Sequence, residues 1–151
     1  MAEGHNLTTM GKTFTLDEAN RSLIFVAPVV KEIKTIWNEL MTFKVNPTQT
    51  EFAEYSKEKT AREKLNRLKI CMSELTQVGC ILKEPLEGLV DFPSFYRDRP
   101  VSLCWHVGEE QADFWHPSEE GYENRQAIDE DFMEWNDKVP LVGRSEAEAK
   151  R

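Results

Sequence analysis

VSLCWHVGEEQADFWH, residues 101–116, contains two short alternating runs separated by a polar turn. Alternation of apolar and polar residues is typical of a strand with one buried face. In the first run the apolar face consists of Val101, Leu103, Trp105 and Val107. Two further short apolar runs, residues 80–83 and 88–92, precede it. The segment therefore predicts a small antiparallel sheet of three to four strands.

The turn GEEQ sets the register between the two runs. A hairpin loop of even length places Trp105 opposite Phe114 and Leu103 opposite His116. An odd loop would bury the carboxylate of Asp113 on the apolar face, which is costly. We therefore expect the even register, with His116 at the end of the apolar face.

The stretch RDRP, residues 97–100, sets the other register if all four residues form the turn. Asp91 then lies opposite His106, with Asp113 on the far side. This arrangement predicts a structural ion-pair row, Asp91–His106–Asp113, which fixes the register. It also places His106 and His116 on opposite faces, so the two histidines do not share a metal site.

Residues 15–43 carry the pattern of an amphipathic helix. Thr15 and Glu18 form a capping box at its start. An apolar stripe at spacings of three and four follows, formed by Leu23, Val26, Val30, Ile33, Trp37 and Leu40. Pro28 lies inside the helix, removes one backbone donor and predicts a kink.

A second helix follows a short connection. Thr48 and Glu51 form its capping box, and Gly79 stands where a glycine ends a helix. Its predicted apolar stripe consists of Ala61, Leu65, Leu68, Met72 and Leu75. Its lysines and arginines suggest either a nucleic-acid surface or an exposed helix with internal ion pairs. Interleaved glutamates, such as Glu58 and Glu63, favour the exposed helix.

These elements predict an α+β protein with a long antiparallel αα-hairpin packed on the small sheet. We expect a flexible N-terminus (1–13), a single domain (14–137) and a flexible tail (138–151). Within the domain, the expected parts are the hairpin (15–78), the β-segment (80–117) and a short helix (128–135).

Charge and composition narrow the classes of partner. Residues 1–108 are neutral overall, whereas residues 109–151 hold 5 basic and 13 acidic residues, which accounts for the net charge of −8. An acidic surface disfavours nucleic acid. The chain has no apolar run of membrane-spanning length and no signal-peptide pattern, so we expect no membrane association. Three cysteines without a CxxC pair fit a reducing cytoplasm.

Several polar residues carry enough chemistry for a site. His116 on an apolar face needs a hydrogen-bond partner, and Glu109, Glu119 or Arg125 is placed to provide one. A satisfied core histidine is the alternative interpretation of His116. Cys104 and His106, two residues apart, are a weak metal-binding signal without a second pair.

The motifs FTLDEAN (14–20), GLVDFP (88–93), RPVSLCWHVGE (99–109) and FWHPSEEGYENRQ (114–126) together resemble a bacterial family known only as a domain of unknown function. What is similar between this chain and the family places the family's pattern positions on Asp91, Phe92, Pro93, Cys104, Trp105, Gly108, Glu109, Trp115, His116, Gly121, Arg125 and Gln126. Of these, His116, Glu109 and Arg125 are the polar positions with the most chemical potential. The family often has arginine where this chain has His106, which argues against a catalytic role for that histidine. The family usually has a glutamate after the Trp-His pair, but this chain has Pro117 there. A pair of ligands formed by the histidine and that glutamate therefore cannot be assigned to this chain. The resemblance implies no reaction.

Two functions follow as expectations. The first is a small, non-enzymatic cytoplasmic interaction or assembly protein, in which the hairpin pairs with a second copy or another protein. The second is a small-ligand or metal-binding protein, with enzymatic activity not excluded, centred on His116, Glu109 and Arg125, with Gln126 as a further ligand-binding candidate. No cofactor is required by the sequence; a divalent metal, with His116 as its candidate ligand, fits the second function.

Overall fold

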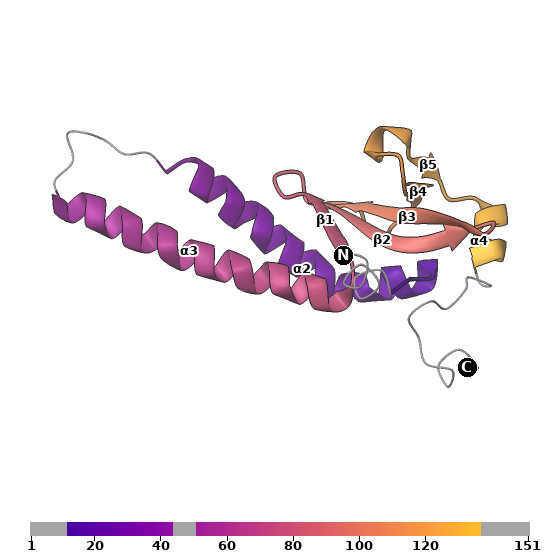
Figure 1. Ribbon diagram of the computed structural model, residues 1–151, viewed down its shortest axis with the longest axis horizontal. Coiled ribbons are helices and arrows are strands. Elements are labelled where there is room, and N and C mark those ends of the chain that lie inside the picture. Colours follow the sequence, from indigo (N-terminus) through magenta and orange to yellow (C-terminus); the bar gives the residue numbers. More distant parts are fainter. Residues whose placement is uncertain (1–11, 44–50, 137–151) are drawn as a thin grey trace, which may run out of the picture.

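The computed structural model describes residues 12–43 and 51–136. For residues 51–55 it describes the backbone alone. Two long helices, α2 (Leu16–Met41) and α3 (Glu51–Val78), run in opposite directions and lie against the sheet (Figure 1). The elements that follow are β1 (Ile81–Glu84), β2 (Leu89–Tyr96), β3 (Arg99–His106), β4 (Phe114–Pro117), the 3₁₀ helix η1 (Tyr122–Asn124), β5 (Gln126–Ala127) and α4 (Glu130–Asn136). The predicted α+β class is confirmed.

The sheet is an antiparallel meander in which each strand pairs with the next, in the order β1-β2-β3-β4-β5. The prediction of three to four strands was wrong, because the sheet has five. The missed strand, β5, has only two residues and therefore shows no alternation in the sequence.

Three predictions fall on residues that are mostly not described. The capping box at 48–51 and the flexible tail at 138–151 lie outside the described residues, apart from the backbone of residue 51. Of the N-terminal segment 1–13 only residues 12 and 13 are described, and Thr13 is buried.

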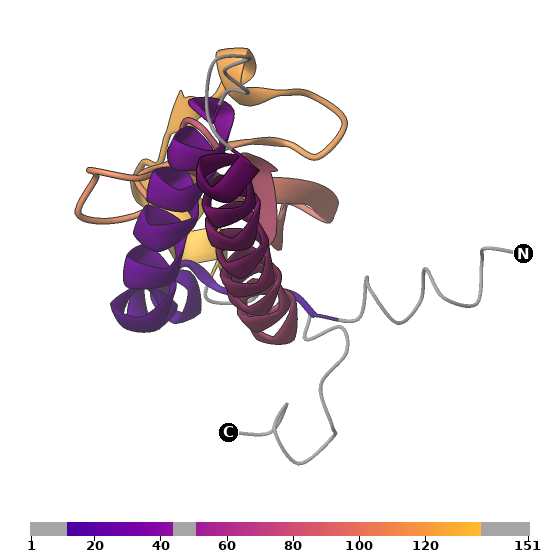
Figure 2. The same cartoon turned by 90° about the vertical axis from the view of Figure 1, so that its left-hand side faces the viewer.

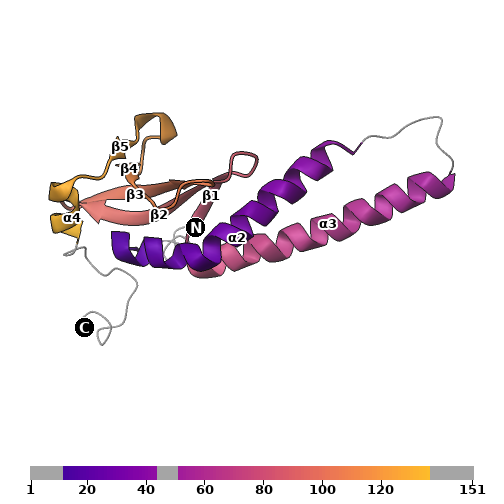
Figure 3. The same cartoon turned by 180° about the vertical axis from the view of Figure 1, so that it is seen from behind.

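Helix α2 begins as its sequence predicts. Thr15 Oγ1 accepts a hydrogen bond from the Glu18 amide (3.1 Å), and the Glu18 carboxylate accepts one from the Thr15 amide (2.9 Å). The predicted stripe faces the core, with four residues buried and two partly buried: Leu23, Val26, Val30, Ile33, Trp37 and Leu40. Figure 3 shows that α2 changes direction along its length, as expected for a helix with Pro28 in its interior.

Helix α3 ends at Gly79 as predicted, but only part of its predicted stripe, Leu68 and Leu75, is buried. Leu68, Cys71 and Leu75 are buried, whereas Leu65 and Met72 are 45% and 39% exposed. Cys71 and Met72 both have helical spacing from Leu68, so periodicity alone does not show which of the two is buried.

Ion pairs between the two helices accompany the orientation of α3. Arg67 forms a bidentate ion pair with Glu32 of α2, with nitrogen–oxygen distances of 2.7 and 2.9 Å. Lys64 pairs with Glu39 of α2 (2.6 Å). Both contacts join α3 to α2 next to the buried Leu68.

The turn between β2 and β3 is shorter than predicted. Only Arg97 and Asp98 form it, both with positive φ (54° and 64°), as in the tight turns that match the twist of a hairpin. Pro100 therefore lies within the ladder, opposite Phe95, and Asp91 lies opposite Cys104. The expected pairing of Asp91 with His106 was wrong by two positions, which leaves the side chains on the predicted faces.

The register between β3 and β4 was wrong by one position. Ser102 lies opposite His116, Leu103 opposite Trp115 and Cys104 opposite Phe114. The prediction assumed a simple hairpin loop of even length and a buried position for Asp113 in the other register. The connection between the strands is longer than such a loop, and Asp113 precedes β4 and is exposed. A one-residue slip moves every side chain of β4 to the other face.

The two faces of the sheet have different chemistry. The face toward α2 is apolar and fully buried, and it is formed mainly by Val90, Phe92, Val101, Leu103 and Trp105. The opposite face carries the buried polar side chains of Asp91, Ser102, Cys104 and His116. The segment with η1 lies on the side of the sheet away from α3 (Figure 1), as the view along the helices also shows (Figure 2).

The short helix predicted at 128–135 is α4. Asp129 caps it by accepting a hydrogen bond from the Phe132 amide (2.8 Å), and Phe132 packs on Tyr96 and Trp115. Asn136 is buried and donates to Ser94 Oγ (3.2 Å), so the end of α4 is bonded to β2.

Two glycines with positive φ provide a test of the sheet edge next to α2. At Gly88 (φ +70°) an added Cβ would lie 2.8 Å from Val107, whereas at Gly108 (φ +103°) it would meet nothing within 4 Å. We expect Gly108→Ala to lower the free energy of unfolding by about 1 kcal/mol through backbone strain alone. Gly88→Ala should cost about 2–3 kcal/mol, because overpacking adds to the strain. Urea denaturation measures both losses, and equal losses would contradict the close contact between Gly88 and Val107.

Candidate functional site

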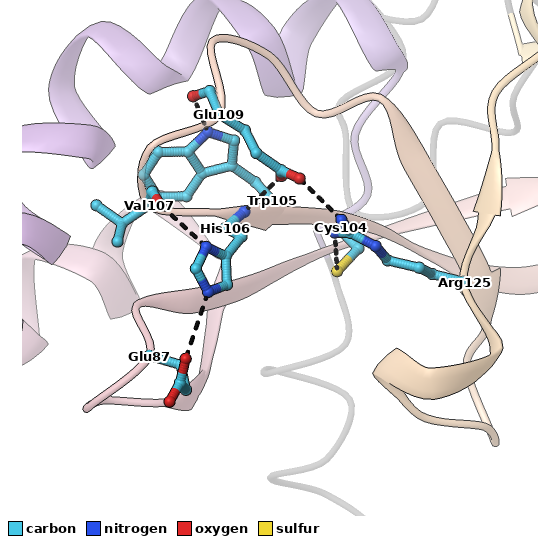
Figure 4. A network of polar contacts seen from close by, with 7 residues as sticks. All are labelled: Glu87, Cys104, Trp105, His106, Val107, Glu109 and Arg125. Atoms are coloured by element: carbon cyan, nitrogen blue, oxygen red, sulfur yellow. Dashed lines mark hydrogen bonds and ion pairs between the residues drawn. The ribbon is translucent and has the colours of Figure 1, made fainter.

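His106 does not lie between two aspartates, so the predicted row Asp91–His106–Asp113 does not exist. Its Nδ1 lies 2.9 Å from the carbonyl oxygen of Val107, and its Nε2 lies 3.6 Å from Glu87 (Figure 4). Glu87 is largely exposed. His106 is thus a half-buried residue at the end of β3 with a surface carboxylate as its neighbour.

Glu109 and Arg125, both predicted as site candidates, contact each other. Arg125 Nη2 donates to Glu109 Oε2 (2.8 Å), and the other carboxylate oxygen accepts from the His106 amide (2.9 Å). The Arg125 guanidinium also stacks on the rings of Phe114 (3.9 Å) and Tyr122 (4.4 Å). The ion pair is mostly buried, so screening by solvent is weak and Arg125 is held firmly.

Arg125 is aimed at Cys104. Its Nη1 lies 3.7 Å from Cys104 Sγ, as Figure 4 shows. Cys104 is fully buried, and burial raises the pKa of its thiol to about 11, while the hydrogen bond from Arg125 acts in the opposite direction. The thiol is therefore protonated at neutral pH in the protein without a bound ion.

His116 contacts none of the partners expected from the sequence. It is 3% exposed, and its Nε2 lies 3.3 Å from both carboxylate oxygens of Asp91. The expected partner Glu119 instead lies near Arg99 (3.9 Å), while Glu109 pairs with Arg125. Gln126 lies exposed on β5 and is not part of this group.

The hydrogen bonds of His116 define its protonation. Its Nδ1 lies 2.8 Å from the carbonyl oxygen of Pro117, and a carbonyl only accepts, so Nδ1 carries a proton. Nε2 faces a carboxylate, so one more proton is shared between His116 and Asp91. Burial raises the pKa of Asp91, and the charge and hydrogen bond of His116 oppose that rise.

Three neighbouring strands bring Asp91, Cys104 and His116 together. One ligand atom from each residue lies within 4.8 Å of the others, and all three side chains are buried. The pairings of β2 with β3 and β3 with β4 place them on one face of the sheet. This cluster, here called the β-face cluster, was missed by the sequence analysis because both registers were wrong.

The β-face cluster does not have the geometry of a cysteine nucleophile with a histidine base. In such a relay the base uses one ring nitrogen for the thiol and the other for the carboxylate. Here Nε2 faces Asp91 and Nδ1 is bonded to the carbonyl of Pro117, so no ring nitrogen is available to the thiol. The high pKa and complete burial of Cys104 also disfavour nucleophilic chemistry.

The comparisons with known proteins concern the family alone. No curated protein and no solved structure matches the chain. Among the described residues, none of the helices combines the length and apolar character needed to cross a bilayer. Residues 12–128, which include the whole β-face cluster, match the family model described as an uncharacterized conserved protein. The chain therefore belongs to this family, DUF2203.

Proposed function

We propose that this protein binds a divalent transition-metal ion through Asp91, Cys104 and His116. The observation that carries the proposal is the convergence of three ligand atoms within 4.8 Å among fully buried side chains. Carboxylate, thiolate and imidazole together suit Zn²⁺ and related borderline ions.

His116 is oriented as a metal ligand usually is. The bond from its Nδ1 to the Pro117 carbonyl fixes the tautomer and the ring, and leaves Nε2 as the ligand atom. Metal-binding histidines commonly use the second nitrogen in this way. Arg125, 3.7 Å from Cys104 Sγ, favours the thiolate that a metal requires.

The charge balance of the buried cluster also supports the proposal. Without a metal, the cluster holds one proton on Cys104 and one shared by Asp91 and His116. A divalent ion replaces two protons and leaves the cluster with the same total charge. Metal binding therefore buries no new net charge, which would otherwise be costly.

Cobalt binding provides the first test. Co²⁺ bound by a thiolate gives a charge-transfer absorption band in the near ultraviolet, and we expect this band for the wild-type protein. Cys104→Ser should abolish the band, and His116→Gln should weaken metal binding by about tenfold or more.

Cys80→Ser is the matched control, because Cys80 is also buried but lies outside the β-face cluster. It should leave the band unchanged. A wild-type protein without a thiolate band, or a band that survives Cys104→Ser, would contradict the proposal.

The pH dependence of Zn²⁺ affinity provides a second test. Burial holds the pKa of Cys104 near 11, so at lower pH the metal must displace its proton, and also the proton of the Asp91–His116 pair. Affinity should therefore fall as pH falls, by about a hundredfold per pH unit where both protons are present. Competition with a chelator at several pH values measures the slope. An affinity that does not change with pH would exclude Cys104 as a ligand.

A second candidate function is self-association through the helical hairpin. Residues 56–67 of α3 include no buried side chain, and Leu65 and Ile70 are about half exposed. Figure 1 shows this half of α3 extending beyond the sheet. Residues 56–67 hold five basic and two acidic residues, and Lys64 and Arg67 already pair with glutamates of α2. The exposed apolar side chains, and not charge complementarity, therefore support this candidate.

Light scattering on the purified chain tests self-association. We expect a dimer that Leu65→Glu with Ile70→Glu converts to a monomer, because two charges would be placed in the interface. Ile81→Glu is the control, since Ile81 is similarly exposed (47%) but lies on β1. A wild-type monomer at all concentrations would contradict this candidate.

A further inference from the structure

A groove lies between α2 and the edge of the sheet, separate from the β-face cluster. It has a volume of about 1070 Å³ and is lined by residues of α2, the β1–β2 turn and the end of β3. Figure 3 shows this turn beside the middle of α2. The groove has the size of a small-molecule site.

The groove has an apolar wall and floor. Its apolar lining residues are Ala27 and Pro28 of α2, Leu86 of the β1–β2 turn, and Trp105 and Val107 at the end of β3. These surfaces suit an apolar group of a ligand.

Two hydrogen bonds hold the sheet side of the groove. The Trp105 indole nitrogen donates to the Glu109 carbonyl oxygen (2.9 Å), as Figure 4 shows. The Val107 amide donates to the Gly88 carbonyl oxygen (2.9 Å), which attaches the β1–β2 turn to β3. A preformed wall lowers the entropic cost of binding.

The charged residues of the groove give it a local positive charge. Both acidic residues that line it are paired elsewhere, Glu39 with Lys64 (2.6 Å) and Glu109 with Arg125 (2.8 Å). Lys31 and Lys34 also line it, and neither forms an ion pair with any residue of the described ranges 12–43 and 51–136. The groove is therefore cationic on a chain whose net charge is −8.

We propose that this groove binds a small organic anion with an apolar body. Lys31 and Lys34 hold the anionic group at the rim, and the apolar body lies against Leu86 and Val107. Thr35 and Asn38, one turn further along α2, offer uncharged hydrogen-bonding groups to the same ligand. The proposal does not depend on metal binding at the β-face cluster.

A pair of fluorescent probes tests both halves of the proposal. Anilinonaphthalene sulfonate has an apolar ring system with an anionic group, and N-phenylnaphthylamine has the same ring system without the charge. For the full chain we expect saturable binding of the sulfonate, about tenfold tighter than that of the neutral probe.

Charge and wall variants locate the site. Lys31→Gln with Lys34→Gln should weaken sulfonate binding by about tenfold and leave binding of the neutral probe unchanged. Leu86→Ser should weaken both probes. Lys59→Gln with Lys69→Gln is the matched control, because it removes two lysines of α3 that do not line the groove. Circular dichroism establishes that each variant is folded, since partly unfolded chains also bind the sulfonate.

Three outcomes would overturn the proposal. They are the absence of saturable sulfonate binding, equal affinity for the two probes, and an equal loss of affinity in the groove and control variants.

Discussion

The pairing of β2, β3 and β4 determines most of what is distinctive in this structure. Asp91 lies opposite Cys104, and Ser102 lies opposite His116. These pairings place the buried side chains of Asp91, Cys104 and His116 together on the face away from α2. The same pairing gives α2 a mainly apolar face. A slip of β4 by one residue would exchange Trp115 with His116, placing a polar ring against the helices and removing it from Asp91.

Such a register is stable only if its buried polar groups are satisfied. The proton shared by His116 and Asp91, and the Glu109–Arg125 ion pair beside Cys104, keep the interior free of unmatched charge. Arg125 connects the ion pair to the β-face cluster, because it donates to Glu109 and also contacts Cys104. The polar face thus combines a structural role with the cluster that we propose as a metal site.

Much of the fold was predictable from local patterns. The capping box at Thr15, the stripe of α2 and the helix end at Gly79 were each confirmed, because they depend on residues within a few turns of one another. The stripe of α3 was confirmed only in part, because Leu68 and Leu75 are buried whereas Leu65 and Met72 are exposed. Periodicity alone does not distinguish Met72 from the buried Cys71, and only contact with α2 decides between them. For the site, the sequence singled out His116, Glu109 and Arg125, but it paired His116 with the wrong partners.

The sequence by itself determined the α+β class, the two long helices and the alternating faces of β3, because periodicity and capping are local properties of the chain. Only the tertiary structure decided which residues of neighbouring strands meet. Arg97 and Asp98 form a two-residue turn with positive φ values, although neither is the glycine usually found in such turns. The connection of residues 107–113 is not a simple hairpin loop, so its length does not predict the register of β4. Those two long-range choices bring Asp91, Cys104 and His116 together.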